Sequence, residues 1–180
     1  MAAFAGFPAA LSFSTGYHAN LSVVQALADS DTLIVSDAHI HASMIDACRL
    51  TRATVIVTAH NDVAAVARAL TGRSQRRALV LAETIYSVLG DAAPLADLAE
   101  LAAAHDAVLI ADEAHAFGVG GPGGRGLLAA QGLAGRPDVV ATGTLSKSFG
   151  SQGGLVLGSP AVREHLVNRS EEHTSELQSP

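Results

Sequence analysis

Two short segments combine acidic, histidine and lysine side chains with small residues, and both follow runs of apolar residues. The first, Val108–His115, reads V-L-I-A-D-E-A-H, which places Asp112 at the end of a predicted buried strand and His115 in the loop beyond it. The second, Thr142–Gly150, reads T-G-T-L-S-K-S-F-G and places Lys147 among hydroxyl and glycine residues. Because ligands bind at the carboxyl ends of strands in open α/β sheets, we expect both segments at one binding edge.

Lys147 is the residue to which the composition points most directly. It is the only lysine of the chain, since the other ten basic residues are arginines. A single lysine is ordinarily a solvated surface residue, but this one lies between two apolar strands rather than on a polar helix face. We therefore interpret Lys147 as functional, whereas Asp112 taken alone also fits a helix cap after a strand.

A third segment, Ser36–Ser43, reads S-D-A-H-I-H-A-S and supplies two histidines just past a strand end. His39 and His41 fit solvated loop positions or a contact at a helix N-terminus. Together with Asp112 and His115 they would also make four metal ligands. A metal-dependent hydrolase is therefore an alternative from another class of function, although it leaves the single lysine unexplained.

The stretch Gly118–Gly126 contains six glycines and one proline. Such a loop lets the backbone approach a ligand closely, but its spacing is too irregular for a known fingerprint. The D-E-A-H string before it also occurs in nucleotide-driven helicases. That interpretation fails because the chain has no G-x-x-x-x-G-K-[ST] phosphate loop. A non-catalytic α/β fragment is the third possibility.

Composition and charge narrow the classes of function. Of the 180 residues, 49% are hydrophobic and 16% are charged, which indicates faces made for further chain or a second subunit. The net charge of -6 gives no basic field for nucleic acid or an anionic membrane. No apolar run approaches the roughly 20 residues of a membrane span. The single cysteine, Cys48, is typical of a reducing compartment, so we expect a cytoplasmic protein.

Short apolar runs alternate with amphipathic segments. Periodicity predicts helices over Asn61–Thr71, which Gly72 ends, and over Pro94–Ala104, whose proline suits a first turn. Strands are predicted at Thr32–Ser36, Thr54–Thr58, Ala78–Ala82, Ala107–Ala111, Val139–Thr142 and Gly154–Leu157. Each run is apolar on both faces, as strands covered on both sides are. We predict an α/β fold whose mostly parallel sheet carries helices on both faces.

The polar segment Arg169–Pro180, R-S-E-E-H-T-S-E-L-Q-S-P, breaks this pattern because it has no apolar face. Its composition predicts a disordered tail. Arg169–Ser179 also looks like the translation of a common sequencing-library adapter. We therefore expect a non-native tail over 169–180 and a predicted domain over 1–168.

Together these segments resemble the α-oxoamine synthase family of fold type I pyridoxal 5'-phosphate (PLP) enzymes. The matching motifs are Phe13–Asn20, Asp37–Ser43, Ala82–Leu95, Asp112–Gly126 and Thr144–Gly154. Any one motif alone is weak, but they follow one another in the family's order and spacing from about residue 3 to Asn168. The resemblance implies part of the large domain of a fold type I PLP-dependent transferase.

The resemblance also assigns roles at the ring of PLP. Lys147 matches the lysine that carries the cofactor covalently and then serves as the base at the substrate's α-carbon. Asp112 matches the carboxylate that holds the proton of the ring nitrogen, and His41 the histidine that stacks on the ring. His115 and Ser87 match residues that contact the ring hydroxyl.

The remaining matches concern the phosphate and the substrate. Gly16 and Tyr17 match a turn whose backbone lies against the cofactor phosphate, and Thr144 matches a phosphate ligand. Glu83 matches an acid of the family's active site, where it and His41 are expected to face the substrate.

Within the family, the motifs most resemble enzymes that condense L-alanine with pimeloyl-CoA and release CoA and carbon dioxide during biotin synthesis. Glycine C-acetyltransferase and other α-oxoamine synthases are alternatives. Family members are homodimers about twice as long, with an N-terminal part that helps to bind acyl-CoA and a small C-terminal domain that holds a substrate-binding arginine. We therefore expect a fragment, inactive alone, that lacks both parts.

Overall fold

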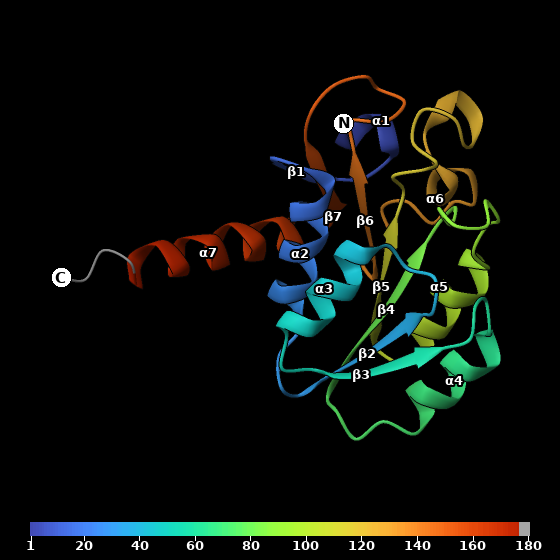
Figure 1. The fold of residues 1–180 in the computed structure, drawn as a ribbon, viewed down its shortest axis with the longest axis vertical. Coiled ribbons are helices and arrows are strands. Elements are labelled where there is room, and N and C mark those ends of the chain that lie inside the picture. The colour runs from blue at the N-terminus through green and yellow to red at the C-terminus, as the bar shows by residue number, and fades with distance from the viewer. Residues whose placement is uncertain (177–180) are drawn as a thin grey trace.

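The apolar runs form one seven-stranded β-sheet in the computed structural model, which describes residues 1–176 (Figure 1). Its strands are β1 (Ala9–Phe13), β2 (Thr32–Asp37), β3 (Thr54–Thr58), β4 (Arg77–Glu83), β5 (Ala107–Asp112), β6 (Val139–Thr144) and β7 (Gly154–Gly158). They are ordered β1-β7-β6-β5-β4-β2-β3. Strands β3, β2, β4, β5 and β6 are parallel, whereas β7 is antiparallel to β6 and β1. The prediction of a mostly parallel sheet is confirmed.

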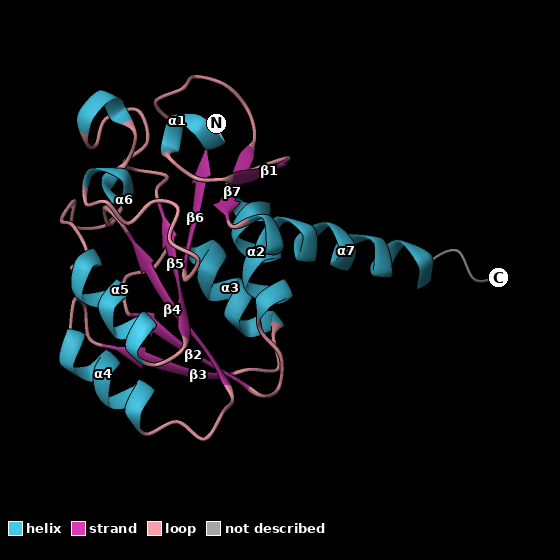
Figure 2. Cartoon of the chain, turned by 180° about the vertical axis from the view of Figure 1, so that it is seen from behind, coloured by secondary structure: helices cyan, strands magenta, loops and turns pink. Residues whose placement is uncertain are grey.

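Helices cover both faces of the sheet. Near the viewer in Figure 1 lie α2 (Gly16–Leu27), α3 (Ala42–Leu50) and α7 (Pro160–Glu176). The opposite face, nearer the viewer in Figure 2, carries α4 (Val63–Thr71) and α5 (Leu95–Ala104). The short helices α1 (Ala2–Ala5), η1 (Pro122–Gly124) and α6 (Leu127–Ala130) lie beside the sheet's upper end in Figure 1.

Two apolar layers hold the helices on the sheet. Because side chains alternate along a strand, Leu33 and Val35 of β2 pack in the layer under α4 and α5, and Ile34 packs in the layer under α2 and α3. All three side chains are almost fully buried. Apolar residues on both faces of a strand were the basis of the predicted fold, and the burial of β2 on both faces is the physical cause of its apolar run.

Three local predictions differ from the structure. Strand β1 was not predicted, because its residues A-A-L-S-F are only partly buried at the edge of the sheet. The helix predicted from Asn61 begins at Val63, since Asp62 caps it and Asn61 adopts a left-handed φ of 55°. Most strands also run one or two residues past the predicted end, so that β6 reaches Thr144.

The segment from Arg169 was expected to be disordered, but α7 continues as helix to Glu176. The sequence contains no glycine or proline between Ala161 and Ser179 that would stop a helix. The last four residues of the predicted tail, 177–180, lie outside the described residues. The expectation that the tail is non-native stays a prediction.

Several large apolar side chains remain exposed on this fold. Val57 on edge strand β3 is 63% exposed, and Val88 and Leu89, in the turn after β4, are 71% and 59% exposed. Such groups agree with the apolar composition and with the expectation of a further partner surface. Within residues 1–176, no helix is both long and apolar enough to cross a membrane.

Candidate active site

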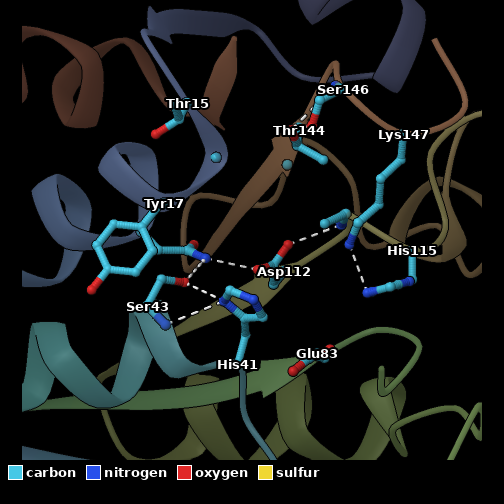
Figure 3. A pocket seen from close by; sticks show the side chains of 14 residues that line it. Thr15, Tyr17, His41, Ser43, Glu83, Asp112, His115, Thr144, Ser146 and Lys147 are labelled. Carbon is cyan, nitrogen blue, oxygen red and sulfur yellow. Dashed lines mark hydrogen bonds between the residues drawn. The ribbon is translucent and has the colours of Figure 1, made fainter. Parts of the chain in front are cut away.

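Three neighbouring strands end at one edge of the sheet and bring polar side chains to a common cavity. Glu83 ends β4, Asp112 ends β5 and Thr144 ends β6. The cavity has a volume of about 220 Å³ and is completed by the first turn of α2, the start of α3 and the loops after β5 and β6 (Figure 3). The predicted binding edge of the sheet therefore forms a cavity in the structure, and both Asp112 and Lys147 line it.

Lys147 and His115 meet at this cavity. The Lys147 Nζ lies 2.6 Å from Nε2 of His115 (Figure 3). Burial lowers the pKa of the Lys147 amine, although the carboxylates of Asp112 and Glu83 oppose this shift. Burial, with the nearby positive charge of Lys147, also lowers the pKa of His115. A neutral His115 accepts a hydrogen bond from the amine at Nε2, so the two groups can share a proton.

Asp112 is fixed by two donors and keeps acceptor capacity. Its Oδ1 accepts the backbone N–H of Ala114 at 2.9 Å, and its Oδ2 accepts the side-chain amide of Asn20 at 2.7 Å. The residue is only 5% exposed. Each carboxylate oxygen has a second lone pair, so Asp112 can still accept a hydrogen bond from a cationic N–H group in the cavity.

His41 caps the N-terminus of α3. Its Nδ1 accepts the backbone N–H of Ser43 at 3.2 Å and lies 2.7 Å from the Ser43 Oγ. The expected helix N-terminal contact is confirmed for His41. Its ring also lines the cavity near Asp112 (Figure 3), so capping and a role in the site are compatible.

The first turn of α2 and the end of β6 form a polar corner. Thr15 caps α2, so Gly16 and Tyr17 are its first helical residues rather than a turn, which corrects the prediction. A Cβ on Gly16 would lie 2.9 Å from that of Thr144, so only glycine fits there. The Thr144 Oγ1 lies 2.8 Å from the hydroxyl of Ser146. Free N–H groups of a helix N-terminus and nearby hydroxyls suit a phosphate group.

Glu83 is 1% exposed. Its Oε2 accepts the backbone N–H of Ser87 at 3.0 Å, while its Oε1 is buried without a hydrogen-bond partner. Burial, reinforced by the charge of Asp112, raises the pKa of Glu83 to about 7. Glu83 can therefore hold a proton near neutral pH. Ser87 itself is exposed and does not line the cavity, so the structure links it to the site through Glu83 alone.

The four ligands of the metal alternative do not converge. His39 lies outside the cavity and stacks on His60, with ring centroids 4.4 Å apart. Among the residues that the structure describes, no group of three or more His, Cys, Asp or Glu side chains could hold a metal ion. The proposed metal-dependent hydrolase therefore lacks its ligand set.

The loop Gly118–Gly126 does not line the cavity either, which corrects the expectation of a close approach to a ligand. It supports the loop of Lys147 instead. Gly118 has a φ of 83°, and a Cβ there would lie 2.5 Å from that of Ser148. The Ser148 hydroxyl donates to the carbonyl oxygen of Phe117. The glycine thus lets one loop pack closely on the residue that follows Lys147.

Sequence reasoning assigned no role to Asn20, Ser43, Thr15 or Ser146, although all four line the cavity. One signal was available for Asn20. It lies in a helix whose neighbouring positions Ala19, Val23 and Val24 are apolar and buried, so an asparagine there needs a polar partner.

Comparison with known proteins defines the family. The model of the aminotransferase class I and II family matches residues 1–180, so the chain belongs to that family. The prediction of an aminotransferase class I and II fold is confirmed.

Two curated relatives are the 8-amino-7-oxononanoate synthases of Mycolicibacterium gilvum and Mycolicibacterium vanbaalenii. Each is 57% identical over 168 residues, which cover 93% of this chain and 44% of the relative. The chain thus spans less than half the length of these relatives.

Solved structures show the same fold. A serine palmitoyltransferase from S. paucimobilis, with a bound PLP–myriocin aldimine, has a TM-score of 0.85 and 37% identity over 92% of this chain and 42% of its own. The 8-amino-7-oxononanoate synthase of Francisella tularensis has a TM-score of 0.83 and 30% identity over 94% of this chain and 49% of its own.

Proposed function

We propose that this chain is the cofactor-binding part of a PLP-dependent acyltransferase that condenses L-alanine with pimeloyl-CoA to 8-amino-7-oxononanoate, CoA and carbon dioxide in biotin biosynthesis. The 57% identity to curated enzymes of that name supports the choice of reaction. The observation that carries the proposal is the Lys147 amine 2.6 Å from His115, in a cavity that Asp112 and Glu83 also line.

The residues at the cavity fit PLP. The polar corner of the α2 N-terminus, Thr144 and Ser146 suits the phosphate, and the close packing of Gly16 on Thr144 leaves backbone at its surface. The unused lone pairs of Asp112 suit the protonated ring nitrogen. The amine of Lys147 is the nucleophile that an aldehyde requires.

PLP, when bound, supplies a ring that withdraws electrons from the α-carbon of the amino acid. The protein's own groups would handle the protons. The lowered pKa of Lys147 increases the fraction of neutral amine, which can attack a carbonyl or take a proton. The Asp112 carboxylate would hold a positive charge at the ring nitrogen. Glu83, protonated near neutral pH, can donate its proton to a substrate oxygen.

The whole enzyme is proposed to be a cytoplasmic homodimer. The exposed apolar residues Val57, Val88 and Leu89 support a partner surface. The substrate-binding arginine and the acyl-CoA entrance are proposed to belong to the remaining length of the enzyme, since the relatives are more than twice as long as their match to this chain. We therefore expect this chain to release no CoA when assayed with L-alanine and pimeloyl-CoA.

Titration of the chain with PLP, followed by absorbance, tests the cofactor assignment. The unaltered chain should develop the band of a covalent PLP–amine adduct. Lys147→Arg is the matched control because it keeps the positive charge but has no amine that forms the adduct. An equal band in the unaltered chain and in Lys147→Arg would contradict the proposal.

A further inference from the structure

One buried amide connects two side chains of the cavity. Asn20, on α2, is 3% exposed and donates through Nδ2 to Asp112 Oδ2 at 2.7 Å and to Ser43 Oγ at 2.9 Å. The Ser43 Oγ in turn lies 2.7 Å from Nδ1 of His41. A continuous chain of hydrogen bonds therefore runs from Asp112 through Asn20 and Ser43 to His41, and its ends are labelled in Figure 3.

Chemistry fixes the direction of each bond. The carboxylate of Asp112 only accepts, so the amide nitrogen of Asn20 rather than its oxygen faces it. The Ser43 oxygen accepts the second N–H of Asn20, which leaves the serine O–H to donate to His41 Nδ1. The backbone N–H of Ser43 also donates to Nδ1, at 3.2 Å. His41 therefore carries its ring proton on Nε2.

We propose that Asn20 is a positioning residue that orients Asp112 and His41 as one unit. The inference rests on the proposed function, in which Asp112 meets the ring nitrogen of PLP and His41 meets the ring face. No other side chain of the same shape would orient both Asp112 and His41. Aspartate would repel Asp112 and accept the Ser43 O–H in place of His41, and leucine would leave Asp112 Oδ2 and Ser43 without their donor.

Nitrogen-15 NMR of the chain labelled in histidine, without any cofactor, tests the network. Asn20→Asp turns a donor into a charged acceptor, so it should draw the Ser43 O–H away from His41. The His41 Nδ1 resonance should then move in the same direction as in Ser43→Ala, since both variants remove that O–H. Asn168→Asp, the same change at an exposed position, should leave the resonance unchanged.

A shift in Ser43→Ala with none in Asn20→Asp would overturn the inference. If Asn20→Asp fails to fold, Asn20→Leu removes both donors without adding a charge. It should move the carboxylate carbon resonance of Asp112, and an unchanged resonance there contradicts the proposed network. If Asn20 only filled space, its substitution would change the stability of the chain and leave these resonances unchanged.

PLP affinity gives the second readout. Loss of a hydrogen bond to a charged group should weaken PLP binding by about tenfold in Asn20→Leu, against less than about twofold in Asn168→Asp. Unaltered affinity in a folded Asn20→Leu overturns the positioning role. Failure of the unaltered chain to bind PLP contradicts the proposed function instead, and the cofactor-free resonances then decide the inference.

Discussion

Two groups of histidines and carboxylates lie beyond the carboxyl ends of neighbouring parallel strands of the sheet and differ in how they are paired. In the first, which we call the clamp, His60 lies between two acids: its Nδ1 is 3.0 Å from Asp37 Oδ1, and its Nε2 is 2.9 Å from Asp91 Oδ2. In the second, the cavity group of Lys147, His115, Asp112 and Glu83, the Lys147 amine bonds a histidine rather than a carboxylate.

The pKa shifts of the two groups run in opposite senses. In the clamp, the hydrogen bond with Asp37 raises the pKa of His60, and that of Asp37 is lowered because its hydrogen bonds outweigh its burial. In the cavity group, burial lowers the pKa of Lys147 and of His115 and raises that of Glu83. The clamp thus favours charged forms, whereas Lys147, His115 and Glu83 of the cavity group are shifted toward neutral forms. This difference separates a structural cluster from one poised for proton transfer.

The largest effect is expected from breaking the clamp. His60→Ala would remove the ion-pair partner of the buried Asp37 carboxylate and leave it only the backbone N–H groups of His39 and Asn61. This loss should lower the free energy of unfolding by about 3 kcal/mol. His115→Ala, in the cavity group, should cost less than about 1 kcal/mol because its bond to Lys147 joins two groups that are both shifted toward neutrality. Urea denaturation of the two variants measures this difference in stability. Equal losses in both variants would contradict the distinction between the clamp and the cavity group.

The pH dependence of stability sharpens this test. Because the pKa of His60 is raised on folding, its stabilisation is complete below the unfolded value of about 6.5 and is lost as pH rises through the folded value. The unaltered chain should therefore lose stability above pH about 6.5. A folded His60→Gln variant should show a flatter profile over that range.

The next effect concerns Glu83, whose pKa of about 7 in the folded chain lies well above the ordinary 4.5. Stability should be highest below the unfolded value and fall as pH rises to about 7, by about 3 kcal/mol in all. Glu83→Gln removes the charge and should recover two-thirds or more of that loss at pH about 8, with little change at pH about 4. Glu164→Gln, at an exposed position, serves as the control. An equal gain in stability in that variant would show that burial of the Glu83 charge is not the cause.

Much of the fold followed from the sequence, because strands β2 and β4 to β7 are buried on both faces and the apolar runs marked them, although edge strand β3 has such a run and is mostly exposed. Edge strand β1 was not predicted, because a partly buried strand does not need a continuous apolar run. Lys147, Asp112 and His115 were found from residue type and position after strands. Asn20 was not, since its partners Asp112 and Ser43 lie 92 and 23 residues away and only folding brings them together.

A smaller effect is expected where the glycine-rich loop supports the cavity group. Gly118→Ala should cost about 2 kcal/mol, because it combines a left-handed φ with a clash against Ser148 beside Lys147. Gly132→Ala is a matched control with a φ of 69° and no atom within 4 Å of the added carbon. It should cost about 1 kcal/mol and leave PLP binding unchanged, whereas Gly118→Ala should weaken it. Equal losses of PLP affinity would contradict the supporting role.

The most direct measurement is to treat the chain with PLP and borohydride and to locate the reduced label by peptide mass spectrometry. Lys147 is the only lysine, so the N-terminal amine is the single competing amine and serves as an internal reference. The account predicts the label on the peptide that contains Lys147 and its loss from that peptide in Lys147→Ala. Label confined to the N-terminus of the unaltered chain would contradict it.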